Sequence, residues 1–171
     1  GFVFHSVDEG VMKDCTDCHG AATSIHAGTS VEKILQSLAH DRLACQVCHI
    51  PAFSRKVATY VDWKWSLAGL DARPADCAAG PTGVAADGVM QRGTYSKMKG
   101  CFTWGTNVRP ALRFYDGKWN RVIVGFNNGY TTTPVDLGSP SATYKDPAAK
   151  IYPFKKMTGN QVADTGRKTM V

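Results

Sequence analysis

The sequence contains the pentapeptide Cys-x-x-Cys-His twice, and this repeat constrains the fold more than any other feature. The first copy is Cys15–His19 and the second is Cys45–His49. This pentapeptide is the attachment signature of a c-type haem, in which two thiols bond to the porphyrin and the histidine ligates the iron. Two copies, among only six cysteines and five histidines, predict two covalently attached haems c. The expected thioether residues are Cys15, Cys18, Cys45 and Cys48, and the expected proximal ligands are His19 and His49.

Two other roles of paired Cys-x-x-Cys motifs fit this sequence less well. A zinc ribbon usually places about 15–20 residues between its pairs, whereas 26 residues separate Cys18 from Cys45. A four-thiolate zinc site also does not require a histidine directly after each pair. A thioredoxin-like motif would lie in a βαβ unit, and no such pattern surrounds these cysteines. Haem attachment is therefore the favoured interpretation.

Three histidines remain to supply the distal ligands of the irons: His5, His26 and His40. Two six-coordinate haems need only two of them, so one histidine is surplus. His40 lies five residues before Cys45, which is too close to pass around that haem to its far face. We therefore expect His26 to serve the second haem and His5 to serve the first. His40 would then ligate a haem on a further segment or a neighbouring subunit.

This assignment leaves two alternatives open. His40 could serve the first haem, which would leave His5 surplus, or the surplus histidine could be structural. With imidazole on both faces, a haem iron has no open coordination position and changes oxidation state with little rearrangement. The sequence therefore predicts electron transfer, and we expect an electron carrier rather than an enzyme.

The charge balance changes along the chain. Residues 1–50 contain three basic and six acidic side chains, and residues 51–171 contain seventeen basic and eight acidic ones. Because each haem adds two propionates, a basic remainder that packs over the haems explains the net charge of +6. Interspersed lysines and arginines without a stacking platform are not typical of nucleic-acid binding. We expect a dihaem segment over residues 1–59 and a haem-free α+β or irregular segment over residues 60–171.

Haem c is attached outside the cytoplasm, so we expect a periplasmic or extracellular protein. The sequence begins with neither an initiator methionine nor a signal peptide. We interpret this start as a removed leader or as the interior of a longer chain. The sequence has no run of about eighteen apolar residues, so no transmembrane helix is expected.

Cys77 and Cys101 are the only cysteines outside the two motifs. Because an exported protein experiences oxidising conditions, we expect a disulfide between them. This bond would close a loop of about 24 residues and contribute about 3 kcal/mol to stability. The alternative is a pair of free buried thiols.

Local patterns predict little regular structure. Thr29 and Glu32 form a capping box, and apolar residues at helical spacing follow, which predicts a short helix over residues 29–38. Residues 111–126 match a β-hairpin, in which two strands flank the turn Asp116-Gly117. The expected strands are Leu112–Tyr115 and Trp119–Val124. We therefore expect a mostly irregular fold with short α-helices and a β-hairpin, organised around covalently bound haems.

Four stretches of this sequence resemble octahaem cytochromes c of the tetrathionate reductase type. They are His40–Pro51 around the second motif, Asp62–Ser66, Phe102–Gly105 and Lys150–Phe154. The resemblance extends from about residue 5 to about residue 165. It implies that the chain is an internal two-haem stretch of a longer multihaem cytochrome. The expected partners are redox proteins or neighbouring haem subunits, in a longer chain or a homo-oligomer.

This resemblance also defines an alternative function. Octahaem proteins of this type reduce a small sulfur or nitrogen oxyanion such as tetrathionate, and the chain would then be a fragment of a reductase. The family carries eight haems, whereas this chain has sites for two. No residue here matches the lysine that ligates the catalytic haem of the family. We therefore favour electron transfer, either within a larger multihaem cytochrome or as a subunit of a haem wire that shares an axial histidine with a neighbouring haem.

Overall fold

The computed structural model describes residues 15–20, 26, 30–31, 39, 41–77, 83–84, 90–91, 93–126 and 128–171. Contacts divide the chain into two units, each assembled from segments far apart in sequence. Unit 1 comprises residues 1–50, 112–120 and 138–153, and unit 2 comprises residues 51–111, 121–137 and 154–171. The predicted division by haem content, at residues 59 and 60, remains a prediction.

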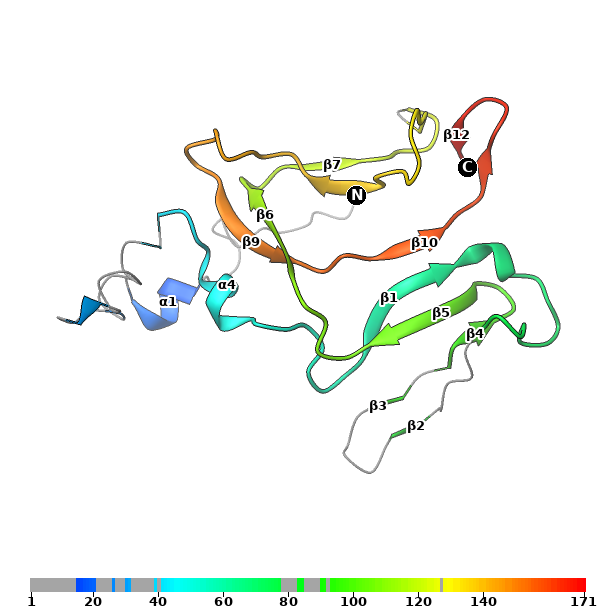
Figure 1. Ribbon diagram of the computed structural model, residues 1–171, viewed down its shortest axis with the longest axis horizontal. Helices are drawn as coiled ribbons and strands as arrows, with labels where there is room; N and C mark the ends of the chain where they lie inside the picture. The colour runs from blue at the N-terminus through cyan, green and yellow to red at the C-terminus, as the bar shows by residue number, and fades with distance from the viewer. Residues whose placement is uncertain are drawn as a thin grey trace. The chain divides into compact units, whose positions relative to one another are not determined.

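The described helices are short, and both α-helices coincide with the Cys-x-x-Cys-His pentapeptides (Figure 1). Helix α1 is Cys15–His19 and helix α4 is Cys45–His49; a 3-10 helix, η2, is Trp65–Leu67. The helix predicted over residues 29–38 lies almost entirely outside the described residues, although Val31 is helical. Within the described part of the chain, no helix has the length and hydropathy needed to cross a bilayer.

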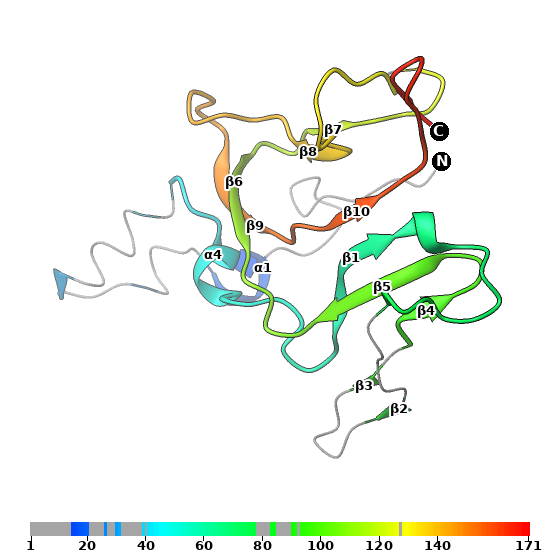
Figure 2. The same cartoon turned by 45° about the vertical axis from the view of Figure 1, so that its right-hand side comes forward.

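Unit 2 contains a four-stranded sheet in the order β10-β1-β5-β4 (Figures 1 and 2). Its strands are β1 (Thr59–Lys64), β4 (Tyr95–Ser96), β5 (Gly100–Gly105) and β10 (Thr158–Asn160). Strand β5 is antiparallel to both β1 and β4, and β10 is parallel to β1. Two further antiparallel pairs belong to this unit. They are β2 (Gly83–Val84) with β3 (Met90–Gln91), and β11 (Ala163–Asp164) with β12 (Thr169–Met170).

A β-bulge in β1 gathers aromatic side chains on one face of this sheet. The register shifts between Tyr60 and Asp62, and the extra residue allows Tyr60 and Trp63 to point to the same side although they are three positions apart. Across the sheet, Tyr60 pairs with Trp104 and Trp63 pairs with Phe102. The ring centroids of these pairs lie 3.8 and 5.5 Å apart. Because Phe102 is only 7% exposed, these rings form an apolar core for unit 2.

The disulfide predicted between Cys77 and Cys101 is present, with Cα atoms 5.6 Å apart. Both cysteines are buried, and the bond ties the chain after η2 to β5. The preceding Gly100 has a φ of +83°, and a Cβ atom there would collide with the carbonyl oxygen of Lys64. Glycine is therefore required at the start of β5 for the chain to pass this close to β1.

Two small sheets, mainly in unit 1, correct the predicted hairpin. Strand β6 (Ala111–Tyr115) pairs with β9 (Lys150–Phe154), and β7 (Trp119–Arg121) pairs with β8 (Gly138–Pro140). Figures 1 and 2 both show β6 beside β9. The two strands expected to pair with each other therefore have other partners, which come from later in the sequence.

The turn between these strands shows why the prediction was only partly right. The turn at Asp116 forms, with Gly117 at a φ of +89° and the Asp116 carboxylate accepting a hydrogen bond from the backbone N–H of Lys118. The second strand ends at Arg121, and a turn closed by the N–H of Phe126 and the carbonyl of Ile123 follows. Apolar alternation alone did not reveal this turn, nor the competing strands β8 and β9.

Candidate haem-binding site

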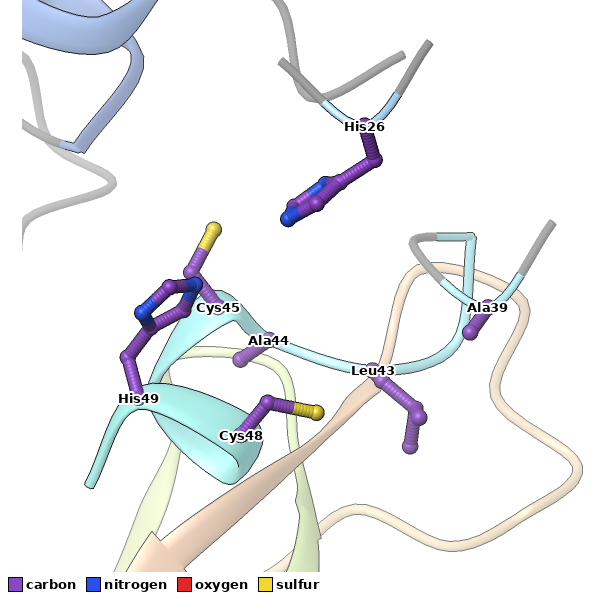
Figure 3. A pocket seen from close by; sticks show the side chains of 7 residues that line it. All are labelled: His26, Ala39, Leu43, Ala44, Cys45, Cys48 and His49. Carbon is purple, nitrogen blue, oxygen red and sulfur yellow. The ribbon is translucent and has the colours of Figure 1, made fainter. Parts of the chain in front are cut away.

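The second Cys-x-x-Cys-His motif lines a cavity of about 240 Å³ in unit 1 (Figure 3). The lining residues are His26, Ala39, Leu43, Ala44, Cys45, Cys48 and His49. The two thiols, the proximal histidine and the distal histidine expected for the second haem therefore all border one cavity. The remaining lining residues are aliphatic, which suits the apolar body of a porphyrin.

Helix α4 explains how both thiols reach this cavity. Cys45 and Cys48 are three positions apart, so their side chains lie on one face of the helix. Neither forms a disulfide, and Figure 3 shows both sulfur atoms extending from α4 beside the cavity. His49 is the last residue of the helix, and its ring borders the same cavity. The local helix thus presents three groups that can hold a haem.

His26 and His49 face each other across the cavity (Figure 3). Their ring centroids lie 6.3 Å apart, and the ring planes are inclined by 36°. Because a ligating imidazole nitrogen lies about 2 Å from its metal and the ring centroid about 1 Å farther away, two imidazoles on opposite faces of one iron have centroids about 6 Å apart. The observed spacing fits one iron between the two rings. The assignment of His26 to the second haem remains a prediction, and this geometry supports it.

A distant segment of unit 1 fixes the chain that leads into α4. The N–H of Ile151 donates to the carbonyl of Arg42 at 2.7 Å, and the N–H of Ala44 donates to the carbonyl of Ile151 at 3.0 Å. These bonds form an isolated parallel bridge between Leu43 and Ile151. Cys45 follows directly after Ala44, which is 6% exposed. Strand β9 therefore sets the place where the second motif begins.

The first motif forms the same one-turn helix, in different surroundings. Every residue of α1 is exposed. The helix ends as Gly20 adopts a φ of +74° and donates its N–H to the carbonyl of Thr16 at 2.9 Å. His5 and His40, the other histidines considered as distal ligands, lie outside the described residues. The distal ligand of the first haem therefore remains a prediction.

The described residues bring together a pair of imidazoles and not a four-ligand zinc site. Across the described ranges, no three side chains of His, Cys, Asp or Glu converge as they would around a metal ion. The four motif cysteines are thus not gathered in one place. This arrangement fits two separate attachment sites.

The sequence interpretation missed the aliphatic wall of the cavity. Ala39, Leu43 and Ala44 line it, and the N–H groups of Arg42 and Leu43 both donate to the carbonyl of Ala39. The only sequence signal for this wall was its position directly before the second motif.

Two comparisons with known proteins show what this chain is similar to. Residues 60–171 match the family model described as bacterial cytochrome c. The solved structure of an octaheme cytochrome c from Shewanella oneidensis is similar to this chain, with a TM-score of 0.66 and 32% sequence identity. The match covers 92% of this chain and 32% of that chain, so this chain spans about a third of the length of the relative. No curated protein matches. The predicted resemblance to octahaem cytochromes c is thereby confirmed.

Proposed function

The chain belongs to the bacterial cytochrome c family, and we propose that it transfers electrons through two covalently attached haems c, one at each Cys-x-x-Cys-His motif. The family match falls on residues 60–171, which contain neither motif, so the two observations support haem attachment independently. Bacterial c-type cytochromes are typically extracytoplasmic, which agrees with the disulfide between Cys77 and Cys101.

The spacing of His26 and His49 is the observation that carries this proposal. Two imidazoles with centroids 6.3 Å apart would hold an iron from both faces and leave no position for a substrate. The bound haem supplies a one-electron ferric/ferrous couple, whose potential is lower with two nitrogen ligands than with a His/Met pair. Electron transfer therefore fits this site better than reduction of an oxyanion at the iron.

The other residues of the cavity serve the same function. Cys45 and Cys48 would fix the porphyrin to α4, and His26 and His49 would hold its iron. Leu43 and Ala44 form an aliphatic wall that would limit the access of water. A site that admits less water reorganises less when the charge on the iron changes, which favours fast electron transfer.

We further propose that the protein acts within a larger multihaem assembly. His5 would be the distal ligand of the first haem, and His40 would ligate a haem on a neighbouring segment or subunit. The likeness to an octaheme cytochrome c about three times as long supports a place among further haems. The count of histidines supports the sharing of one axial ligand, because two six-coordinate haems need four of the five.

Substitution of His26 tests the proposed ligation. Mass spectrometry of the denatured wild-type protein should find two covalent haems, and its visible spectrum should be entirely low-spin. In His26→Ala the haem count should stay at two while one haem becomes high-spin and binds added carbon monoxide in its ferrous form. His5→Ala is the matched control, since it should open a different haem. A wild-type protein with an open, ligand-binding haem would contradict the proposal and favour a reductase fragment.

Electron paramagnetic resonance provides a second test of the same pair. The angle between two axial imidazole planes affects the splitting of the two iron d orbitals, dxz and dyz, that π-bond with the imidazoles. An angle of 36° predicts a rhombic low-spin spectrum with three resolved g values for the second haem. A single large g feature, which nearly perpendicular imidazoles produce, would be inconsistent with His26 and His49 on one iron.

A further inference from the structure

We propose that Arg42 is a positioning residue for the second haem, and this inference rests on the proposed attachment of that haem to Cys45 and Cys48. Arg42 lies three residues before Cys45. Its side chain would hold the chain that forms the aliphatic wall of the cavity and leads into α4.

The guanidinium group of Arg42 binds a segment more than a hundred residues away. It donates hydrogen bonds to the backbone carbonyls of Tyr144 at 2.6 Å, Asp146 at 3.0 Å and Pro147 at 3.4 Å. It also lies over the ring of Phe114, 5.3 Å from the centroid, at a distance typical of a cation–π contact. A planar fork with five donors fits three converging carbonyls, whereas a lysine ammonium does not reproduce this geometry.

The loop that accepts these bonds is itself closed by short-range hydrogen bonds. The carboxylate of Asp146 accepts from the backbone N–H of Thr143 at 2.6 Å and from its hydroxyl at 3.3 Å. The N–H of Asp146 donates to the carbonyl of Thr143, and the N–H of Ala149 donates to the carbonyl of Asp146. Ala149 is fully buried. The carbonyls that bind Arg42 therefore belong to a defined turn and not to a loose loop.

The position of Arg42 in the chain links this turn to the haem cavity. Leu43, Ala44 and Cys45 follow Arg42 directly, and all three line the cavity. The backbone carbonyl of Arg42 accepts the N–H of Ile151, so side chain and backbone both attach to residues 144–151. Without the guanidinium, the backbone bridge between Leu43 and Ile151 would still hold this wall to that segment.

A loosened wall predicts a change in redox potential. Water that enters the cavity stabilises the ferric form, which carries one more positive charge than the ferrous form. Solvent exposure is one of the factors by which a protein sets the potential of a haem. Removal of the Arg42 fork should therefore lower the potential of the second haem and leave that of the first unchanged.

Spectroelectrochemical titration of the full, haem-loaded chain tests this role. In Arg42→Ala we expect the oxidation equilibrium of one haem to shift about tenfold toward the ferric form, which is about 59 mV for one electron. The affected haem should be the one that His26→Ala converts to high-spin. Arg42→Lys keeps the charge but not the fork, so it should show the same shift.

Arg113→Ala is the matched control, because it removes the same charge from unit 1. The Arg113 guanidinium donates to the carbonyl of its neighbour Leu112, so both potentials should stay at their wild-type values. If Arg42→Lys restores the wild-type potential, the charge acts and not the fork, and the positioning role is wrong. An unchanged potential in Arg42→Ala would also overturn it.

The haem count separates this inference from the proposed function. A wild-type mass that lacks the haem at Cys45 and Cys48 would overturn both. Two haems in the wild type, with potentials that do not respond to Arg42, would overturn the role of Arg42 alone. If the Arg42→Ala protein cannot be obtained with both haems, the same titration of Asp146→Ala tests the role. This substitution loosens the turn that accepts the hydrogen bonds and leaves Arg42 intact. We expect a shift of about threefold in the same direction, and no shift would refute the role.

Discussion

The two Cys-x-x-Cys-His helices have the same pattern and the same length but different surroundings. Helix α1 is exposed along its whole length. Helix α4 follows the buried Ala44, whose N–H donates to the carbonyl of Ile151 on β9, and it borders a cavity with His26 opposite. The pentapeptide therefore determines the one-turn helix and its two thiols and histidine, and the neighbouring segments determine the surroundings of each helix.

The largest expected effect comes from removing each attachment site in turn. Either Cys15→Ser with Cys18→Ser or Cys45→Ser with Cys48→Ser should reduce the haem count by one, measured by mass spectrometry of the denatured protein. The replacement of Cys45 and Cys48 should also destabilise the fold more than the replacement of Cys15 and Cys18. At about 24 cal/mol per Å³, an unfilled cavity of about 240 Å³ costs at most roughly 6 kcal/mol. Equal losses of thermal stability would show that the cavity around α4 does not depend on a haem.

Removing the disulfide should destabilise unit 2 without changing either haem site. Replacement of Cys77 and Cys101 by serine should lower the free energy of unfolding by about 3 kcal/mol, because the bond restricts the unfolded chain. Urea unfolding measures this loss. The visible spectrum should stay unchanged, and a high-spin component in this variant would show that the disulfide also supports a haem.

Overpacking next to the second motif should affect one haem only. Ala149 is fully buried in the segment 144–151, which binds Arg42 and contains Ile151. Ala149→Val should therefore destabilise the fold by about 1–3 kcal/mol and shift the potential of the second haem. The adjacent Ala148 is exposed, which makes Ala148→Val a control with the same added volume and no expected effect. Equal responses of both haems would mean that the two sites are not independent.

The smallest effect concerns the turn between β6 and β7. The side chain of Lys118 donates a hydrogen bond to Asp116, as does the backbone N–H of Lys118, and together they lower the pKa of the Asp116 carboxyl. A carboxyl with a lowered folded-state pKa adds stability above its unfolded pKa, and this contribution is lost as the pH falls through the folded-state value. Between neutral pH and a pH of about 3, the Asp116→Asn variant should therefore lose less thermal stability than the wild type. Asp71→Asn, at an exposed ion pair with Lys97 in unit 2, is the control.

Local chemistry determined what could be predicted from the sequence. Cysteines three positions apart share one helical face, so the Cys-x-x-Cys-His spacing alone predicts both attachment sites, which remain predictions. Two remaining cysteines in an oxidising compartment were enough to predict the disulfide between Cys77 and Cys101, which the structure contains. These predictions needed only the residues within each motif, or a count over the chain.

Only the tertiary structure decided which distant segments meet. Strand β6 pairs with β9 and not with β7, because the partner of a strand depends on every segment that can compete for its backbone hydrogen bonds. In the same way, the carbonyls that bind Arg42 come from residues 144–147, and the carbonyl that accepts the N–H of Ala44 belongs to Ile151 on β9. Such contacts leave no periodic pattern in the sequence, since each is made by a backbone group that every residue carries.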